Sequence, residues 1–319
     1  MRKEHYLLKV LTPLHIGAGQ GLGHVDLPIV REAHTNFPYI PGTSLKGALR
    51  NLEINQVARA REEKPSQVEE KLTDKEKFDP KEEDILRLAK IFGTAGEVAE
   101  RDKEGLEKGK EVGAGKVLFS DAFVVLFPVK SAKGVFSLTT CPYVINRFFE
   151  LLGIDQRVED VPEGKVKVLN INGHKNLIKD NNKYKLLLEE FAFEAEESEE
   201  LEKFVELVGA FVGEENKRRI VCVNDTDFMD FVSNYTEVRT HIKINLDTGT
   251  VKEGALWTEE YVPAESVFAF SLVLLEEINE EINYSREKIS YSPPPTFHLG
   301  GDITSGKGFV KVQKLEVSQ

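Results

Sequence analysis

The chain has 319 residues, of which 40% are hydrophobic and 30% are charged, so it can bury a core in one large domain or in two smaller ones. Its two cysteines, Cys141 and Cys222, are too few and too far apart in sequence for a disulfide framework or a metal knuckle. The amino terminus runs directly into a strand-like segment, residues 5–11, and no apolar run reaches membrane-spanning length, so we expect no signal peptide and a cytoplasmic location.

The formal net charge of −12 is unusual for a nucleic-acid-binding protein, because phosphate contacts rely on Lys and Arg. The acidic residues are unevenly distributed along the chain, however. Seven glutamates lie between residues 194 and 206, whereas residues 297–314 contain Asp302 as their one acidic residue, together with three lysines. One basic stripe beside an acidic outer face would bind RNA in register and resist non-specific nucleic acid. The alternative for 194–206 is a helix that the glutamates merely keep soluble.

Hydrophobic periodicity predicts an alternation of strands and helices. The predicted strands cover residues 4–12, 116–127, 220–224, 267–275 and 307–317, and the predicted helices cover 43–57, 142–151, 198–212 and about 276–288. The segments 239–246 and 254–261 flank Asp247-Thr248-Gly249, which is a hairpin turn signal. The pattern is α+β, and a ferredoxin-like βαββαβ core with large insertions fits it, as do other α+β arrangements.

Residues 38–50 combine a Gly-Thr-Ser turn with the start of a basic, apolar-periodic helix. Ser44 or Thr43 can cap the first turn, and free backbone N–H groups with the helix dipole favour an anion there. Lys46 and Arg50 lie four residues apart on one face of the predicted helix. The segment therefore predicts a phosphate-binding helix N-terminus, against the alternative of an ordinary capped helix with solvated charges.

Two glycine-rich loops resemble nucleotide sites, and neither completes the motif. Gly301 to Lys307 matches the first seven positions of a P-loop, but Gly308 stands where Ser or Thr would hold magnesium. Residues 17–23 carry glycine at every second position and lead into Asp26-Leu27-Pro28 rather than into a helix. Both loops would let backbone approach a polyanion closely, although tight turns between strands explain them equally well.

Eight stretches of the chain form one recognisable series of motifs: His15-Ile-Gly-Ala-Gly19, Gly23-His-Val-Asp26 through Glu32, Pro41 to Gly47, Phe119 to Ala122, Phe127 to Lys130, Gly254 to Glu260, Gly300 to Asp302, and Gly306 to Phe309. This series resembles the RAMP superfamily of CRISPR proteins, and more narrowly the repeated backbone subunit of the type III-B (Cmr) effector complex. The resemblance rests on these stretches. It spans residues 15–309, while 51–110 and 151–219 carry no matching motif.

The resemblance implies a ferredoxin-like (RRM-like) palm with large insertions, one of which forms a thumb-like hairpin. We accordingly expect one domain over 1–319, with a core drawn mainly from 1–57, 111–150 and 220–319 and with insertions at 58–110 and 151–219. For the thumb we favour 151–219, because residues 165–169 and 183–186 can form a basic hairpin around Asn172-Gly173.

The resemblance also implies a function: binding CRISPR guide RNA, assembly with further copies of itself and other Cmr subunits along a helical backbone, and cleavage of complementary target RNA at regular intervals. Asp26 matches the aspartate on which that cleavage depends. Its carboxylate can hold Mg²⁺ or Mn²⁺ against a phosphate oxygen, or take the proton of the attacking 2′-hydroxyl, and either route yields a 2′,3′-cyclic phosphate. The alternatives are a non-catalytic guide-binding subunit and a metal-independent guide-processing endonuclease.

Further residues are weaker candidates for the same site. His15, Glu259 and Tyr261 would assist proton transfer or position the substrate, although a strand-end histidine and exposed strand positions explain them without catalysis. Backbone-phosphate contacts are expected from the following residues: Ser44, Lys46, Arg50, Arg239, Lys243, Gly300, Gly301 and Lys307. For the lysines and arginines, the alternative is an ordinary solvated surface.

Overall fold

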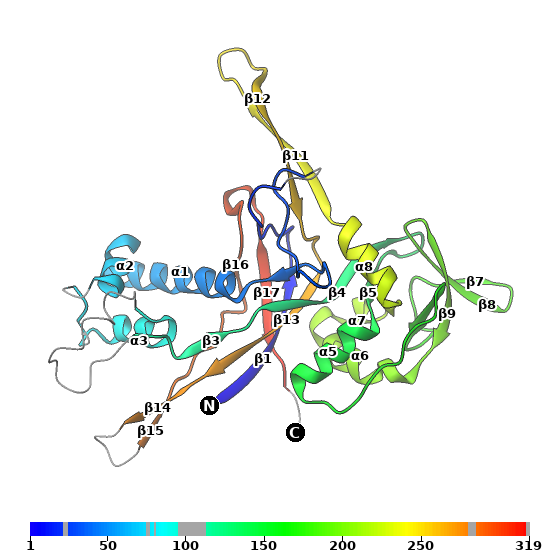
Figure 1. The fold of residues 1–319 in the computed structure, drawn as a ribbon, viewed down its shortest axis with the longest axis horizontal. Coiled ribbons are helices and arrows are strands. Elements are labelled where there is room, and N and C mark those ends of the chain that lie inside the picture. The colour runs from blue at the N-terminus through cyan, green and yellow to red at the C-terminus, as the bar shows by residue number, and fades with distance from the viewer. Residues whose placement is uncertain (22–24, 75–76, 80, 95–112, 280–284, 317–319) are drawn as a thin grey trace. The chain divides into compact units, whose positions relative to one another are not determined.

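The computed structural model describes residues 1–21, 25–74, 77–79, 81–94, 113–279 and 285–316 (Figure 1). The chain forms two compact units. Unit 1 comprises Met1–Glu4, Pro41–Asp121 and Ser271–Phe297, and unit 2 comprises His5–Ile40, Ala122–Phe270 and His298–Gln319. The prediction of one domain with two insertions stays a prediction. The mixed α/β character is confirmed, and no helix in the described ranges is long and apolar enough to cross a membrane.

A large mixed sheet forms the centre of unit 2. Its strands run in the spatial order β17-β1-β13-β4-β5-β10-β6-β9-β8-β7, and an additional pairing of β4 with β8 closes six of them into a barrel-like ring. The strand bounds are Arg2–Val10 (β1), Tyr39–Ile40 (β2, paired with β4), Ala122–Ser131 (β4), Val135–Thr140 (β5), Lys165–Val168 (β6), Ile178–Asp180 (β7), Lys183–Leu188 (β8), Phe191–Glu197 (β9), Ile220–Cys222 (β10), Val267–Leu274 (β13), Thr296–His298 (β16) and Phe309–Lys314 (β17).

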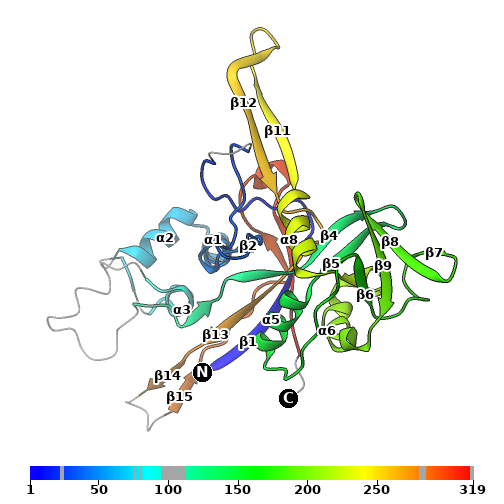
Figure 2. The same cartoon turned by 45° about the vertical axis from the view of Figure 1, so that its right-hand side comes forward.

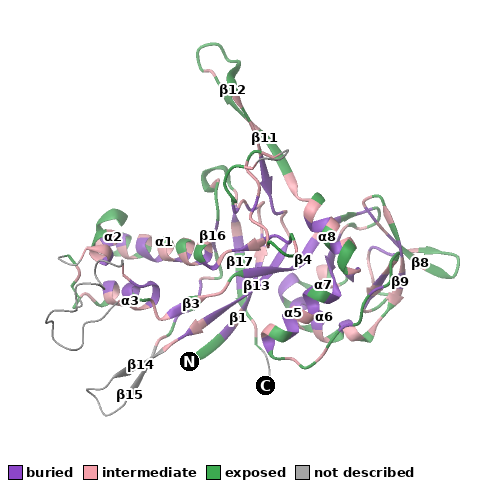
Figure 3. Ribbon diagram, viewed as in Figure 1, coloured by how far each residue is buried: buried purple, intermediate pink, exposed green. Residues whose placement is uncertain are grey.

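Two helices, α5 (Pro142–Leu152) and α6 (Glu202–Val212), build the core of unit 2 with this sheet. Pro142 opens α5, where its missing N–H costs no hydrogen bond, and Gly153 ends it in the left-handed conformation. The apolar faces of α5 and α6 share one buried cluster with β1, β4 and β13. Figure 3 shows the two helices and these strands as largely buried. Shorter helices α7 (Glu214–Lys217) and α8 (Asp225–Asn234) follow.

The predicted hairpin is present as β11 (Glu237–Ile244) and β12 (Val251–Tyr261). It extends away from the other elements of unit 2 in both views (Figures 1 and 2). The antiparallel register places Thr240 opposite Thr258 and Ile242 opposite Leu256. Since side chains alternate along a strand, the hairpin has two chemically different faces. The face that carries Thr240, Thr258, Ile242 and Leu256 is called the apolar face, and the opposite face, which carries Arg239 and Glu259, is called the polar face.

Unit 1 contains α1 (Gly42–Arg61), α2 (Pro65–Thr73), α3 (Glu83–Phe92), β3 (Val117–Phe119), β14 (Glu276–Asn279) and β15 (Ser285–Lys288). The prediction of a helix near 276–288 is wrong, because β14 and β15 pair antiparallel from Glu276 opposite Lys288 to Asn279 opposite Ser285. A run of glutamates and isoleucines has enough helix propensity to suggest a helix, and cross-strand pairing overrides it here.

Two further expectations need correction. Residues 165–169 and 183–186 do not form a hairpin with each other: β6 pairs in parallel with β9 and antiparallel with β10, and β8 pairs with β7 and β9. The predicted strand 116–127 is broken between β3 and β4, where the Asp121 carboxylate accepts a hydrogen bond from Gly42 N–H at 2.7 Å.

Candidate active site

Asp26 lies in unit 2, beside the apolar face of the hairpin. Its Oδ2 accepts hydrogen bonds from the Thr258 backbone N–H at 2.8 Å and from the Thr258 hydroxyl at 2.9 Å, while its own N–H lies 3.0 Å from that hydroxyl oxygen. Within the described part of the chain, these bonds leave Oδ1 without a donor. Asp26 is exposed, and the Thr258 N–H, followed by its hydroxyl, lowers the pKa of the carboxyl. The site therefore presents a fixed, ionised carboxylate to solvent.

The backbone after Asp26 pairs with β12 as a short parallel segment. Leu27 N–H donates to the Thr258 carbonyl at 3.0 Å, and Glu260 N–H donates to the Leu27 carbonyl at 3.0 Å. This pairing puts the side chains of Asp26 and Thr258 on one side of the strand and those of Leu27 and Glu259 on the other. The position of Asp26 is thus set by the register of residues 26–29 against β12.

Tyr261 is the centre of a buried cluster on the polar face. Its hydroxyl lies 2.5 Å from Glu259 Oε2, 3.0 Å from Asp302 Oδ2 and 3.2 Å from His241 Nε2. Glu259 also accepts from Trp257 Nε1–H at 2.7 Å, and the Trp257 ring stacks on His241. The Tyr261 hydroxyl thus donates to the carboxylates of Glu259 and Asp302, which links the hairpin to the Asp302 turn.

The protonation states of this cluster disfavour proton transfer. Burial raises the pKa of Tyr261, and the carboxylates of Glu259 and Asp302 raise it further, so the phenol stays protonated. Although burial alone would raise the pKa of Glu259, hydrogen bonds from Tyr261 and Trp257 lower it to about 2. The Tyr261 and Glu259 side chains are buried, at 0% and 7% exposure respectively. A positioning role suits Glu259 and Tyr261 better than acid–base chemistry does.

His15 joins the same region from the end of the segment after β1. Its Nδ1–H donates to the Glu260 carbonyl at 2.7 Å, and its ring lies 5.6 Å from the Tyr261 ring. Gly301 N–H donates to the His15 carbonyl at 3.0 Å, and a Cβ at Gly300, whose φ is +79°, would lie 2.2 Å from that carbonyl oxygen. Position 300 therefore requires glycine for a structural reason, because any Cβ there would clash with the His15 carbonyl.

Cationic side chains gather on the polar face. Lys307 Nζ and the Arg239 guanidinium lie 5.7 and 5.8 Å from the Tyr261 ring centre, and Lys243 follows on the same side of β11. Arg239 also pairs with Glu237 at 2.6 Å. The structure thus brings together Arg239, Tyr261 and Lys307, three residues predicted from the sequence to bind RNA or assist catalysis, and places Lys243 farther along β11.

The apolar face carries half-exposed aliphatic side chains leading to Asp26. Its members are Val238, Ile242, Ile244, Val251 and Leu256, each between 46% and 64% exposed. In unit 2, Asp26 contacts Thr258 and has no hydrogen bond with the described His15, Glu259 or Tyr261. Thr258 was not among the predicted site residues, although its place in the alternating run Trp257 to Tyr261 could have indicated it.

The three remaining predicted RNA contacts lie in unit 1, at the start of α1. Pro41 rather than Ser44 or Thr43 is the N-cap, and its side chain makes no capping bond; the Asp121 carboxylate takes the first N–H instead. Arg50 pairs with Glu69 of α2 at 2.8 Å. Burial, with Arg50 nearby, lowers the pKa of Lys46, which lines a cavity of about 400 Å³ with Thr43 and Phe119.

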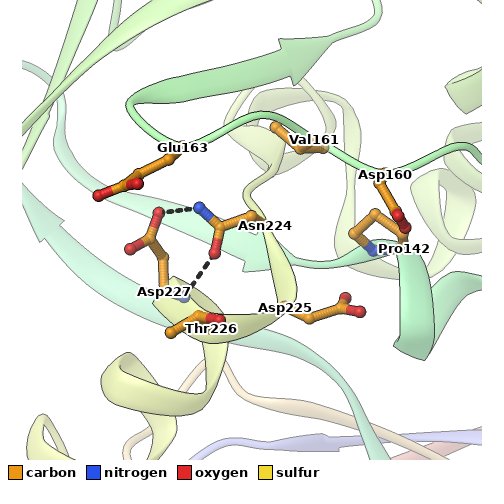
Figure 4. Close-up of a pocket in the computed structure, with 8 residues that line it drawn as sticks. All are labelled: Pro142, Asp160, Val161, Glu163, Asn224, Asp225, Thr226 and Asp227. Atoms are coloured by element: carbon orange, nitrogen blue, oxygen red, sulfur yellow. Dashed lines mark hydrogen bonds between the residues drawn. The ribbon is translucent and has the colours of Figure 1, made fainter.

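A second cavity, of about 470 Å³, lies in unit 2 between the segment after α5 and the start of α8 (Figure 4). It is lined by Pro142, Asp160, Val161, Glu163, Asn224, Asp225, Thr226 and Asp227. No residue predicted for catalysis or RNA binding is among these. Four carboxylates at its rim would repel a phosphate backbone, so this cavity is a poorer candidate for an RNA-binding site than the surface around Asp26.

The described residues contain no group of three or more His, Cys, Asp or Glu side chains placed to hold a metal ion. This does not conflict with Mg²⁺ at Asp26, because Mg²⁺ keeps several waters and is commonly held by one or two carboxylates together with substrate phosphates. Asp26 Oδ1 fits that mode, as an exposed oxygen on a carboxylate that its neighbours keep ionised.

The chain that carries this barrel-like mixed sheet belongs to the RAMP superfamily, whose family model matches residues 7–311. The chain is 35% identical over 98% of its length to the CRISPR system Cmr endoribonuclease Cmr4 of Pyrococcus furiosus, covering 95% of that protein. The crystal structure of oligomeric Cmr4 from Pyrococcus furiosus superposes with a TM-score of 0.61 at 28% identity, covering 100% of both chains.

A subunit of the type III-B Cmr-beta complex bound to cognate target RNA also superposes on the chain, with a TM-score of 0.62. The alignment covers 98% of this chain and 97% of that one at 18% identity. At this identity the likeness shows a shared fold.

Proposed function

We propose that this chain is the RNA-guided endoribonuclease subunit that forms the repeated backbone of a type III-B CRISPR effector complex. It binds guide RNA, assembles with further copies of itself and with other Cmr subunits, and cleaves complementary target RNA in the cytoplasm. The full-length likeness to a Cmr endoribonuclease and to an oligomeric Cmr4 supports this function. The observation that carries the catalytic part is the exposed Asp26 carboxylate, fixed and ionised by Thr258.

The core of unit 2 supports a ferredoxin-like palm. Four strands lie in the order β17-β1-β13-β4, which is the 4-1-3-2 order of a βαββαβ sheet, and β17 and β4 pair antiparallel with their neighbours β1 and β13. We assign the thumb-like protrusion to the β11–β12 hairpin rather than to residues 151–219, because this hairpin extends from the palm and exposes aliphatic side chains.

The two faces of the hairpin suit two different RNA strands. Arg239, Lys243 and Lys307 on the polar face suit the guide backbone, which is bound without regard to sequence. The apolar face leads to Asp26, so we place the target strand there, with aliphatic side chains against its bases. A hairpin inserted between the strands would present the target 2′-hydroxyl to the carboxylate.

At the reacting bond, the Asp26 carboxylate can accept a hydrogen bond from the 2′-hydroxyl of the target and orient its oxygen for attack on the adjacent phosphorus. A bound Mg²⁺ or Mn²⁺, held by Asp26, would supply charge neutralisation at the phosphate. The lowered pKa favours this role over general base catalysis, because a weakly basic carboxylate removes a proton poorly at neutral pH. As the 2′-oxygen bonds to the phosphorus, its proton passes to solvent water and the bond to the 5′-oxygen breaks. The 5′-oxygen takes a proton from water, so the products carry a 2′,3′-cyclic phosphate and a 5′-hydroxyl.

Cleavage of guide-paired RNA by the assembled complex, with and without EDTA, tests this proposal. Metal-dependent cuts at regular intervals support it. Guide binding without cleavage would instead indicate a structural subunit, and metal-independent cutting of precursor hairpins by the isolated chain would indicate a guide-processing enzyme.

Thr258→Val should slow target cleavage about 10-fold, the lower end of what loss of a bond to a ligating carboxylate costs. Valine keeps the backbone N–H and removes the hydroxyl donor, so the pKa of Asp26 rises toward its usual value. The acidic limb of the pH–rate profile should therefore move to higher pH. Single-turnover rates across pH measure both effects. Thr258→Ser keeps the hydroxyl and is the matched control; equal rates for both variants would contradict the role of this bond.

Removing cationic side chains from the polar face should weaken guide binding for every guide sequence. Lys243→Ala and Lys307→Ala should each lower the salt slope of guide affinity by about 1, and Lys46→Ala in unit 1 should do the same. Leu256→Ala, on the apolar face of the same hairpin, removes no charge and should leave the slope unchanged. Filter binding at several salt concentrations measures these slopes. Unchanged slopes for all three lysines would favour an ordinary solvated surface.

A further inference from the structure

Glu260 is a buried carboxylate, 6% exposed, on the same side of β12 as Thr258. Its Oε1 accepts hydrogen bonds from Arg31 at 2.5 Å and from the Thr236 hydroxyl at 2.7 Å. Its Oε2 accepts the backbone N–H of Ile29 at 3.0 Å. A single side chain thus bonds to the backbone three residues after Asp26, to the Arg31 guanidinium and to the start of β11.

Arg31 extends these contacts to α8. Its second terminal nitrogen donates to the Val232 carbonyl at 2.8 Å and to the Asn36 carbonyl at 3.0 Å. Arg31 is 16% exposed, so both members of the pair are largely removed from water. The segment carrying Asp26 is therefore tied on one side to β12 and on the other to the end of α8.

Backbone bonds also hold this segment, but most of them lead to residues 16–21, which include three glycines, and not to β12. Gly21 N–H donates to the Asp26 carbonyl and Ala18 N–H to the Pro28 carbonyl, each at 2.9 Å. The backbone contact with β12 itself is one isolated parallel bridge at Leu27. A buried ion pair adds little stability over a well-packed apolar pair, but an arrangement that separates the two charges is costly, because each would be left buried without its partner. The Arg31–Glu260 pair is therefore suited to fixing register rather than to holding the unit folded.

We propose that Arg31 and Glu260 are positioning residues for Asp26, which set the register of residues 26–31 against β12 and so hold the carboxylate at the reacting bond. The inference rests on the proposed function of Asp26. Misplacement of a reacting group by an ångström can cost about 100-fold in rate, so loss of this register should appear in the rate of the chemical step. Neither side chain contacts Asp26 in the described structure, and each acts through the backbone between them.

Four variants test the proposal in the assembled complex: Glu260→Gln, Arg31→Met, the double variant, and Arg31→Lys. Glutamine keeps the size of the side chain but has one acceptor oxygen. It therefore cannot accept the hydrogen bond of Ile29 N–H on one oxygen and those of Arg31 and Thr236 on the other. Lys9→Met, which breaks the Lys9–Glu265 ion pair of 2.7 Å elsewhere in unit 2, is the matched control.

The single variants should lower the single-turnover rate about 100-fold while guide and target affinities stay within about 3-fold, because the phosphate contacts are untouched. The double variant removes both buried charges, so its melting temperature should recover toward that of the parent while cleavage stays slow. Arg31→Lys keeps the charge and should recover part of the rate. Lys9→Met should cleave at the parental rate.

Parental cleavage by the double variant, or a loss of target affinity that accounts for the slower rate, would overturn the positioning role. An Asp26→Asn complex measured alongside separates the two proposals. If that complex cleaves at the parental rate, the assignment of Asp26 fails; if it is inactive while the Arg31 and Glu260 variants are parental, only the positioning role fails.

Discussion

Replacing Asp26 by asparagine is expected to lower target cleavage at least about 1,000-fold, while guide binding and assembly stay within about 3-fold of the parent. Asparagine retains the shape of the side chain, and its amide oxygen can still accept the Thr258 N–H, but the negative charge is lost. Without that charge the side chain binds a metal ion far more weakly and accepts a weaker hydrogen bond from the reacting 2′-hydroxyl. Cleavage of labelled target RNA by the assembled complex measures the effect.

The control for this variant is Asp155→Asn, an exposed loop aspartate of unit 2 whose loss changes the net charge equally. It should cleave like the parent. Near-parental cleavage by an assembled Asp26→Asn complex would contradict the assignment of the catalytic residue. Loss of guide binding in that variant would show instead that Asp26 is needed for assembly.

A single 2′-deoxy substitution just 5′ of one scissile bond should abolish cleavage at that bond and leave the other cuts intact. The 2′-oxygen is the nucleophile of the proposed reaction, and no other oxygen is placed in line at that phosphate. The remaining cuts should persist, because each is made by a separate copy of the chain with its own Asp26. Product lengths on a denaturing gel, compared with an all-ribose target, give the result.

Metal removal and end-group analysis complete this test. EDTA should stop all cuts together, and added Mg²⁺ or Mn²⁺ should restore them, if the ion neutralises charge at the phosphorus. Products should end in a 2′,3′-cyclic phosphate and a 5′-hydroxyl. Cutting at the deoxy position, or ends with a 3′-hydroxyl and a 5′-phosphate, would indicate an activated water, and Asp26 would then belong to a hydrolytic metal site.

Much of the fold could be predicted from local pattern, because its strongest elements are both periodic and well delimited. Helix α5 lies between Pro142 and Gly153, and the β11–β12 hairpin surrounds a Thr-Gly turn; both occur where the sequence indicated. The prediction failed where distant partners decide the structure. The residues of β6 pair with residues 29 positions away in β9 and 55 positions away in β10, and the β14–β15 pairing overrides the helix propensity of its residues.

The candidate site could be predicted from the sequence to a similar extent. Asp26, His15, Glu259 and Tyr261 could be selected because motifs mark them, and the structure places them all in unit 2. Their division between two sides of β12 could not be foreseen, since it depends on the register of Leu27 against Glu259, 232 residues apart. The sequence equally gave no sign that Glu260 pairs with Arg31, because a charged pair leaves no periodic pattern.

The alternation of side chains along β12 decides which residues face Asp26 and which face the opposite side of the strand. Thr258 and Glu260 serve the Asp26 segment, while Trp257, Glu259 and Tyr261 serve the opposite side. Deleting one residue within this run would exchange the two sets, so that a glutamate would face Asp26 in place of a hydroxyl donor and repel it. Single substitutions in the strand would therefore damage one function at a time, whereas a change in its length would damage both together.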